Sequence, residues 1–92
     1  MTDTPQQAAE SSAEDEAIIR DVLAGNVNAF ASLERKYRRI VTFLIRKMIR
    51  DDEDVNDLVQ DTFVKAFQAL PSFQFEYPFS RWLYKIASNR CI

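Results

Sequence analysis

The feature of this chain that most limits its fold is the scarcity of residues that make tight turns. One glycine and three prolines occur in 92 residues. Sandwiches and barrels need many tight turns, and a phosphate-binding loop of the glycine-rich type needs several glycines. The sequence therefore favours helices over these alternatives.

Apolar residues recur at helical spacing in four segments. Gly25 suits the end of the first segment, Asp51 or Asp52 caps the third, Pro71 stops it and Pro78 opens the fourth. The fold class is therefore predicted to be all-α, a compact bundle of about four helices. The predicted helices span residues 13–24, 27–50, 53–70 and 78 to the end of the chain.

Residues 1–12 are mostly small and polar and show no apolar period. We expect them to form a disordered N-terminal tail ahead of a single helical domain at residues 13–92. The apolar pattern of the last helix runs on to the final residue without a cap, a glycine or a proline. We therefore expect this helix to continue in a longer protein.

The composition excludes several classes of function. The chain has no histidine, which is the commonest general base and zinc ligand, and its single cysteine cannot form an internal disulfide. No apolar run is long enough to span a membrane, and the N-terminus lacks the basic start of a signal peptide. We expect a cytoplasmic protein that is not an enzyme and uses no metal or other cofactor.

The net charge of −2 conceals alternating blocks of charge. Residues 1–21 carry −5, residues 22–50 carry +6, residues 51–61 carry −6 and residues 62–92 carry +3. Blocks of this size indicate more than one charged surface and more than one partner. The alternative is a set of solvated helix faces.

The predicted second helix has a basic face opposite its apolar stripe. The stripe is centred on Phe30 and Met48 and includes Ile40, Val41 and Leu44. A line of four arginines on the opposite side is a candidate track for phosphate groups, with a solubilising face as the alternative. These arginines are Arg35, Arg39, Arg46 and Arg50.

The predicted third helix has a polar face with an apolar centre. Asp57, Gln60 and Asp61 lie away from the core stripe, and Val64 lies among them. An apolar centre ringed by acids and amides is typical of a small protein interface, although a lone exposed valine is also ordinary.

Six aromatic residues crowd the segment from residue 73 to residue 84. Phe73, Phe75 and Tyr77 lie in the predicted loop, where they either cover the open end of the core or form a surface on which unpaired bases stack. On the last helix, Trp82, Lys85 and Asn89 share one edge, beside Arg81. Stacking, phosphate neutralisation and base-edge hydrogen bonding on one edge suit single-stranded nucleic acid.

Two motifs resemble the second conserved region of bacterial RNA polymerase sigma factors, in the form of the extracytoplasmic-function (ECF) group. They are DLVQDTF at residues 57–63 and FSRWLYKIASN at residues 79–89. The resemblance covers residues 15–92. The loop between the motifs differs from the family pattern, because it reads QFEYP at residues 74–78, where a basic residue and a glycine are frequent.

The resemblance implies a domain that binds core RNA polymerase at the clamp coiled coil of the beta-prime subunit. It also implies recognition and melting of the promoter minus-ten element through the non-template single strand. An anti-sigma factor is a further partner that the resemblance allows. The family's second DNA-binding domain lies outside these residues, so we expect the chain alone not to direct transcription.

Site residues follow by position from the same resemblance. Asp57, Gln60, Asp61 and Val64 correspond to polymerase contacts, with Val64 as the apolar centre. The DNA-binding residues are expected to be Phe73, Gln74, Phe75, Arg81, Trp82, Lys85 and Asn89. Phe73 and Asn89 are expected to meet around one extruded base. The alternative function is a small helical protein-interaction adaptor that uses the acidic face and binds no DNA.

Overall fold

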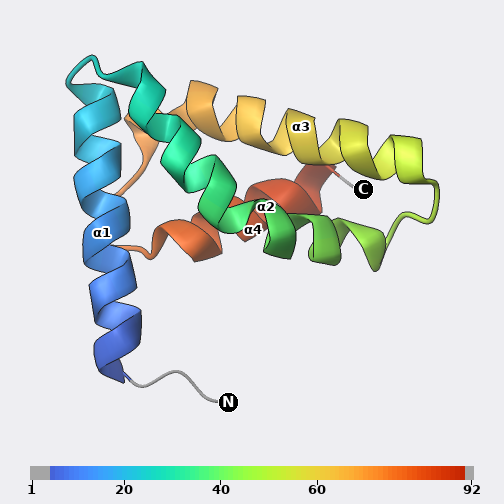
Figure 1. Cartoon of the computed structure of the whole chain (residues 1–92), viewed down its shortest axis with the longest axis horizontal. Coiled ribbons are helices and arrows are strands. Elements are labelled where there is room, and N and C mark those ends of the chain that lie inside the picture. The colour runs from blue at the N-terminus through green and yellow to red at the C-terminus, as the bar shows by residue number, and fades with distance from the viewer. Residues whose placement is uncertain (1–4, 91–92) are drawn as a thin grey trace.

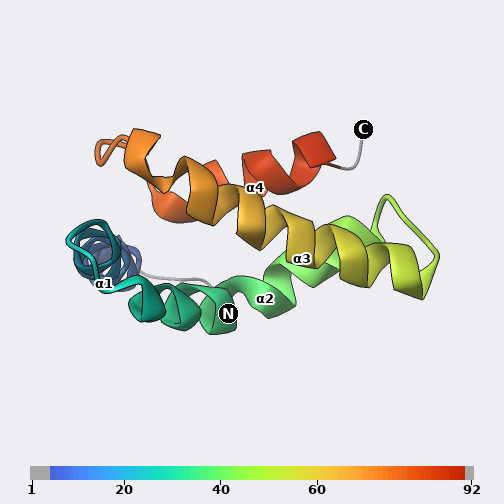
Figure 2. The same ribbon diagram turned by 90° about the horizontal axis from the view of Figure 1, so that it is seen from above.

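The computed structural model of the chain describes residues 5–90, and the side chains of residues 12–89. Within that range it contains four α-helices and two short 3₁₀ turns, which confirms the predicted all-α fold. Figure 1 shows α1 lying across one end of the other three helices, and Figure 2 shows α1 end-on from above. The elements are α1 (Pro5–Leu23), η1 (Val27–Ala29), α2 (Phe30–Arg46), α3 (Asp52–Ala69), η2 (Leu70–Ser72) and α4 (Phe79–Arg90).

Helix α1 begins earlier than predicted, at Pro5 instead of near residue 13. Residues 5–12, which we expected to belong to the tail, are helical, and residues 1–4 lie outside the described part of the chain. Proline is favourable in the first helical turn, and the glutamines, alanines and glutamate that follow it are good helix formers.

Gly25 ends α1 as predicted, with a positive φ of 117°. The amide of Asn26 donates to the carbonyl of Asp21 (3.0 Å), and the amide of Gly25 donates to the carbonyl of Val22 (3.0 Å). This pair of hydrogen bonds is the Schellman arrangement, which satisfies carbonyls left free at a helix end.

Helix α2 ends at Arg46, four residues before the predicted end, so Arg50 lies outside it. Figure 1 shows α2 and α3 running in opposite directions, and residues 47–51 make the reversal. The predicted boundaries left two residues for that connection, whereas the structure uses five. The Asp51 side chain caps α3 by accepting a hydrogen bond from the amide of Asp54 (3.0 Å).

The apolar stripe of α2 also differs from the predicted one. Ile45 is fully buried, whereas Ile40 is 40% exposed and Met48 is 49% exposed, although both were predicted to face the core. Tyr37, Val41 and Ile45 follow one another at intervals of one turn along the buried side. Met48 lies past the last turn of the helix, where that spacing no longer applies.

All four helices contribute to one core. Phe73 joins it from the segment between η2 and α4 and is 6% exposed. The largest fully buried side chains are Ile19, Leu33, Ile45, Leu70, Leu83, Val41, Val55, Val59 and Thr62.

A buried carboxylate connects α1 to α2. Asp15 is 2% exposed and accepts hydrogen bonds from the Lys36 ammonium (2.8 Å) and from the Tyr37 hydroxyl. Burial raises the pKa of Tyr84 on α4, and the negative charge of Asp15 raises it further. Asp15 precedes Ile19 and Val22 by four and seven residues, so its helical spacing places it on the apolar stripe of α1.

Candidate functional site

A groove opens between the loop before α4 and the exposed side of α4. We call it the loop groove, and its volume is about 420 Å³. Helix α4 begins at Phe79, directly after Pro78, and the turn before it is closed by a hydrogen bond from the Tyr77 amide to the Gln74 carbonyl (3.1 Å). The groove is lined by Ser72, Gln74, Tyr77, Arg81, Trp82 and Lys85.

The loop groove combines three kinds of side chain that suit an unpaired nucleotide. Tyr77 is 57% exposed and Trp82 is partly exposed, so aromatic rings are open for stacking. Arg81 and Lys85 are exposed cations that can neutralise phosphate. The Gln74 amide can both donate and accept a hydrogen bond at a base edge.

Four of the seven predicted DNA-binding residues therefore line one groove, namely Gln74, Arg81, Trp82 and Lys85. Tyr77 joins them; the sequence indicated it only as one of three loop aromatics that either cover the core or stack on bases. Tyr77 is 57% exposed, whereas Phe73 in the same segment is 6% exposed. The sequence signal for Tyr77 was only its membership of the aromatic cluster.

Phe73 does not offer a free stacking face. It packs edge-on against Phe75 (5.3 Å between ring centroids) and Trp82 (5.3 Å), and it also contacts Phe79 (5.9 Å). The predicted pocket shared by Phe73 and Asn89 is therefore corrected: Phe73 supports the loop groove from beneath. Phe75 is half-buried and faces the Arg20 side chain of α1.

Asn89 lies on the other side of Trp82, in a second groove between α3 and α4 of about 280 Å³. We call it the α3–α4 groove. Ser72 and Trp82 line both this groove and the loop groove, so the two form neighbouring compartments. The lining residues of the α3–α4 groove are Lys65, Ala69, Ser72, Trp82, Ile86 and Asn89.

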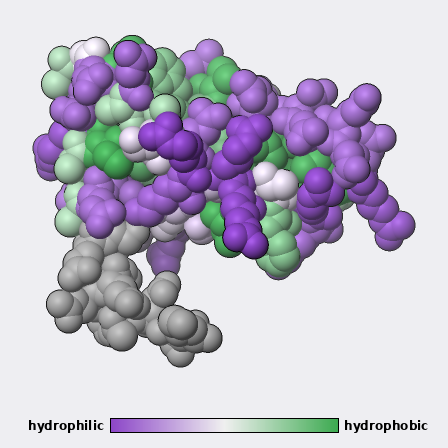
Figure 3. All heavy atoms as spheres, in the orientation of Figure 1, coloured by the Kyte–Doolittle hydropathy of each residue, from purple (hydrophilic) through white to green (hydrophobic). Residues whose placement is uncertain are grey.

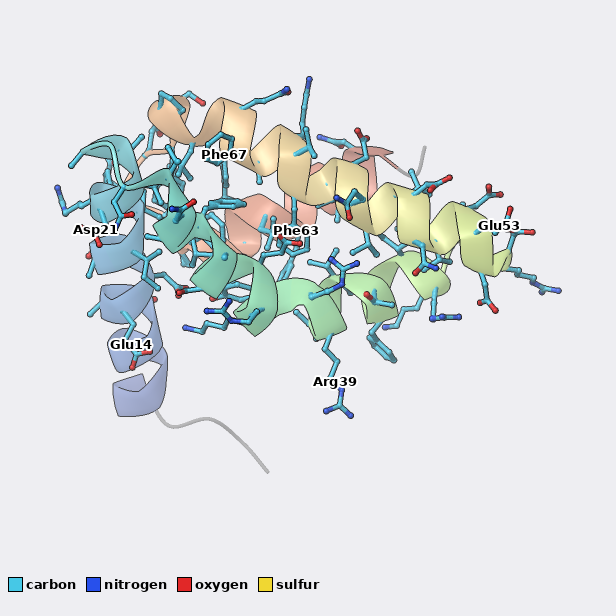
Figure 4. All side chains as sticks on the ribbon, turned by 45° about the horizontal axis from the view of Figure 1, so that its top comes forward. Glu14, Asp21, Arg39, Glu53, Phe63 and Phe67 are labelled. Atoms are coloured by element: carbon cyan, nitrogen blue, oxygen red, sulfur yellow. The ribbon has the colours of Figure 1, made fainter. Side chains whose placement is uncertain are left out.

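A third groove, the α2–α3 groove, lies on the opposite flank of α3 and has a volume of about 350 Å³. Phe67, which reaches from α3 toward α2 in Figure 4, is 39% exposed and packs edge-on against Phe30 (5.3 Å). Val64 beside it is 46% exposed. The lining residues of the α2–α3 groove are Phe30, Glu34, Gln60, Phe63, Val64, Phe67 and Gln68.

Two of the four predicted polymerase contacts, Gln60 and Val64, line the α2–α3 groove. Asp57, one turn before Gln60, is exposed. Asp61 is only half-exposed. Sequence reasoning missed Phe67, which was assigned neither to the core stripe nor to the polar face of this helix. Figure 3 shows a largely hydrophilic face interrupted by small hydrophobic areas.

The predicted arginine track is only partly assembled. Arg35 and Arg39 are exposed on α2, and Figure 4 shows Arg39 pointing away from the bundle. Arg46 instead forms an ion pair with Asp52 of α3 (2.7 Å), and Arg50 belongs to the connection between the helices. The continuous line of four therefore becomes two exposed arginines and one paired arginine, with Arg50 off the helix.

Residues 12–89 show neither a metal site nor a membrane span. No cluster of three or more carboxylate and thiol side chains is arranged to hold an ion there. No helix within the described residues has the length and apolar character to cross a membrane.

Comparison with known proteins shows which family the chain belongs to. The family model for Sigma-70 region 2 matches residues 33–92. The chain is 34% identical over 76 residues to the RNA polymerase sigma-H factor of Pseudomonas aeruginosa, covering 83% of this chain and 39% of that protein. It is 37% identical over 75 residues to the ECF RNA polymerase sigma-E factor of Escherichia coli K12, covering 82% of this chain and 39% of that protein.

A solved structure is also similar. An engineered region 2 of sigmaE, determined by NMR in complex with GTAAAA, superimposes with a TM-score of 0.78 at 38% sequence identity. The match covers 84% of this chain and 80% of that one. The family match, the relatives and the shared fold together establish that this chain belongs to the Sigma-70 region 2 family, a non-enzymatic family of transcription initiation, with ECF sigma factors as its relatives.

Proposed function

We propose that the chain recognises and helps to melt the promoter minus-ten element by holding the non-template strand along the loop groove and the α3–α4 groove. The observation that carries this proposal is the loop groove, where exposed aromatic rings, two cations and an amide meet. The similar sigmaE region 2 was solved in complex with GTAAAA, which supports nucleic-acid binding by this fold.

Each group in the two grooves has a distinct task in this proposal. Tyr77 and Trp82 stack on bases that leave the duplex, which offsets part of the cost of unstacking them. Arg81 and Lys85 neutralise phosphates and therefore contribute to affinity for every sequence. Gln74 and Asn89 read base edges, because an amide both donates and accepts hydrogen bonds.

We further propose that the α2–α3 groove and the exposed polar face of α3 bind core RNA polymerase at the beta-prime coiled coil. Val64 and Phe67 supply an apolar centre, and Gln60 and Gln68 supply polar groups around it. Asp57 adds an exposed acid on the same helix, and Asp61 adds a half-exposed one. This arrangement of apolar centre and polar rim is typical of protein interfaces.

The fluorescence of Trp82 provides the test of DNA binding, because Trp82 is the only tryptophan of the chain and lies between the two grooves. We would titrate the chain with single-stranded hexanucleotides based on GTAAAA and varied one base at a time. Lys85→Ala should lower affinity for every sequence by about three- to tenfold and reduce the salt dependence by about one unit. Asn89→Ala should relax preference at one position only.

Arg38→Ala is the matched control, because Arg38 is an exposed arginine on α2 that pairs with Glu34 (3.1 Å). It should change neither affinity nor base preference. A wild-type chain that binds no hexanucleotide, yet binds a beta-prime coiled-coil fragment, would contradict the DNA proposal and favour the adaptor.

A further inference from the structure

The loop before α4 is held from outside by an arginine of α1. The guanidinium carbon of Arg20 lies 4.2 Å from the centroid of the Phe75 ring. This distance is within the range of a favourable cation–π contact. The contact connects α1 to the loop at Phe75.

Phe75 is also the first of three rings in successive edge-on contact. The third ring, Trp82, lines both the loop groove and the α3–α4 groove. Its ring packs edge-on against Phe73 (5.3 Å), and Phe73 packs edge-on against Trp82 (5.3 Å). Phe73 is 6% exposed, so it has little room to shift by itself. Because closely packed rings transmit displacement, a shift of Phe75 is passed to Trp82.

Phe75 also lies in the turn that carries two side chains of the loop groove, Gln74 and Tyr77. Gln74 and Tyr77 line the loop groove, and their backbones are joined by the hydrogen bond from the Tyr77 amide to the Gln74 carbonyl (3.1 Å). Phe75 lies inside that turn and points to the other side, toward α1. Holding Phe75 therefore holds Gln74 and Tyr77 in place.

Arg20 itself is poorly placed to bind phosphate. Arg20 lines neither the loop groove nor the α3–α4 groove. Its guanidinium instead lies against the Phe75 ring, 4.2 Å from the ring centroid. Arg20 therefore acts on the loop and not on the nucleic acid.

We propose that Arg20 is a positioning residue that sets base preference by fixing Phe75, and through it the loop groove. This inference rests on the proposed function, because it assigns the specificity of the same grooves. In this proposal, α1 contributes to base recognition although none of its residues lines the loop groove or the α3–α4 groove. The chain uses a side-chain anchor in a loop that contains no glycine.

The test compares Arg20→Ala with wild type on the hexanucleotide panel. We expect the affinity ratio between preferred and non-preferred bases to fall by about two- to fivefold at one position, as expected from losing a cation–π contact. The melting temperature should fall by only about 2–8 °C, because the contact also stabilises the folded chain. Arg20→Lys should restore part of the ratio, because an ammonium also binds a ring face.

Phe75→Leu removes the ring but keeps an apolar side chain, and it should reproduce the effect of Arg20→Ala without adding to it in the double variant. Hydrogen exchange of the Tyr77 amide, measured without nucleic acid, should accelerate in both variants. Arg38→Ala again serves as the control and should alter neither quantity.

The outcomes separate this inference from the proposed function. If wild type shows base preference and Arg20→Ala keeps every ratio, the positioning role is overturned while the proposed function stands. A loss of affinity in Arg20→Ala that leaves every ratio unchanged also overturns it, because Arg20 then contributes to affinity without setting base preference. If wild type binds no hexanucleotide, the proposed function fails and the role of Arg20 in base preference fails with it.

Discussion

Asp15 illustrates how a single buried charge fixes one helix against the bundle. Its carboxylate accepts hydrogen bonds from Lys36 (2.8 Å) and from Tyr37, and its side chain is 3% exposed. A buried carboxylate with two donors is stable as a set, but removing one member leaves the others with an uncompensated cost. Lys36 remains 31% exposed, so water limits that cost on its side of the pair.

We expect Asp15→Ala to lower the free energy of unfolding by about 2–3 kcal/mol, measured by urea denaturation. Glu14→Ala, at the exposed neighbouring position, should change it by less than about 0.5 kcal/mol. The charge of Asp15 is one cause of the raised pKa of Tyr84, so that pKa should fall in Asp15→Ala when followed by tyrosinate absorbance. Equal stability of the two variants would show that the buried carboxylate is dispensable.

At the residue scale, the exposure of the three loop aromatics could not be predicted from the sequence. Spacing placed Phe73, Phe75 and Tyr77 in a loop but could not rank their exposure, because a loop has no period that assigns faces. The outcome depends on a contact with α1, which is distant in sequence, and on ring contacts with α4. Phe73 is buried, Phe75 meets Arg20, and Tyr77 is exposed in the loop groove.

At the scale of elements, the start of α3 depends on a run of four acidic residues, Asp51 to Asp54. Asp51 accepts the Asp54 amide hydrogen bond (3.0 Å), and Asp52, Glu53 and Asp54 occupy the first turn. Acids at this end interact favourably with the helix dipole, and the cap satisfies an amide that would otherwise lack a partner in the helix.

We expect Asp51→Ala to destabilise the chain by about 1 kcal/mol in thermal or urea unfolding. Asp51→Asn should retain most of the stability, because an asparagine oxygen accepts the same hydrogen bond. A loss in Asp51→Asn as large as in Asp51→Ala would indicate that charge, and not capping, stabilises this end of α3.

The elements also explain part of the charge pattern. The acidic block at residues 1–21 meets the basic block at 22–50 through Asp15 and Lys36 (2.8 Å). The basic block meets the acidic block at 51–61 through Arg46 and Asp52 (2.7 Å). Some of the charge that suggested external partners thus joins one element to the next, which block sums along a sequence cannot reveal.

Helix existence and order followed from apolar period and turn residues, whereas helix ends were harder to predict. Helix α2 ends at Arg46, and residues 47–51 connect it to α3. No glycine or proline lies between 47 and 50 to mark this end in the sequence. The exposure of Met48 and the separation of Arg50 from the arginine line both follow from the end at Arg46.

In the molecule as a whole, α3 separates the α2–α3 groove from the α3–α4 groove. Gln60, Val64 and Phe67 face the α2–α3 groove, and Lys65 and Ala69 face the α3–α4 groove. No described residue lines both of these grooves. The chain can therefore hold a protein on one flank of α3 and a nucleic acid on the other.

We expect variants on the two flanks to act independently. Val64→Arg should weaken binding to a beta-prime coiled-coil fragment by about 1–3 kcal/mol and leave hexanucleotide affinity unchanged. Lys85→Ala should do the reverse, and the double variant should combine both losses within about 0.5 kcal/mol. Ile40→Arg, at an apolar position of α2 that is 40% exposed, is the control and should alter neither. Coupling well above that limit would refute the separation by α3.

The turn after α1 discriminates between mirror-image amino acids. An L side chain added at Gly25 would meet no atom within 4 Å, so space is available, but the φ of 117° strains every L residue. A D-amino acid prefers positive φ for the same steric reason that an L-amino acid avoids it. A chemically synthesised chain with D-alanine at position 25 is therefore expected to keep the turn that L-alanine would strain.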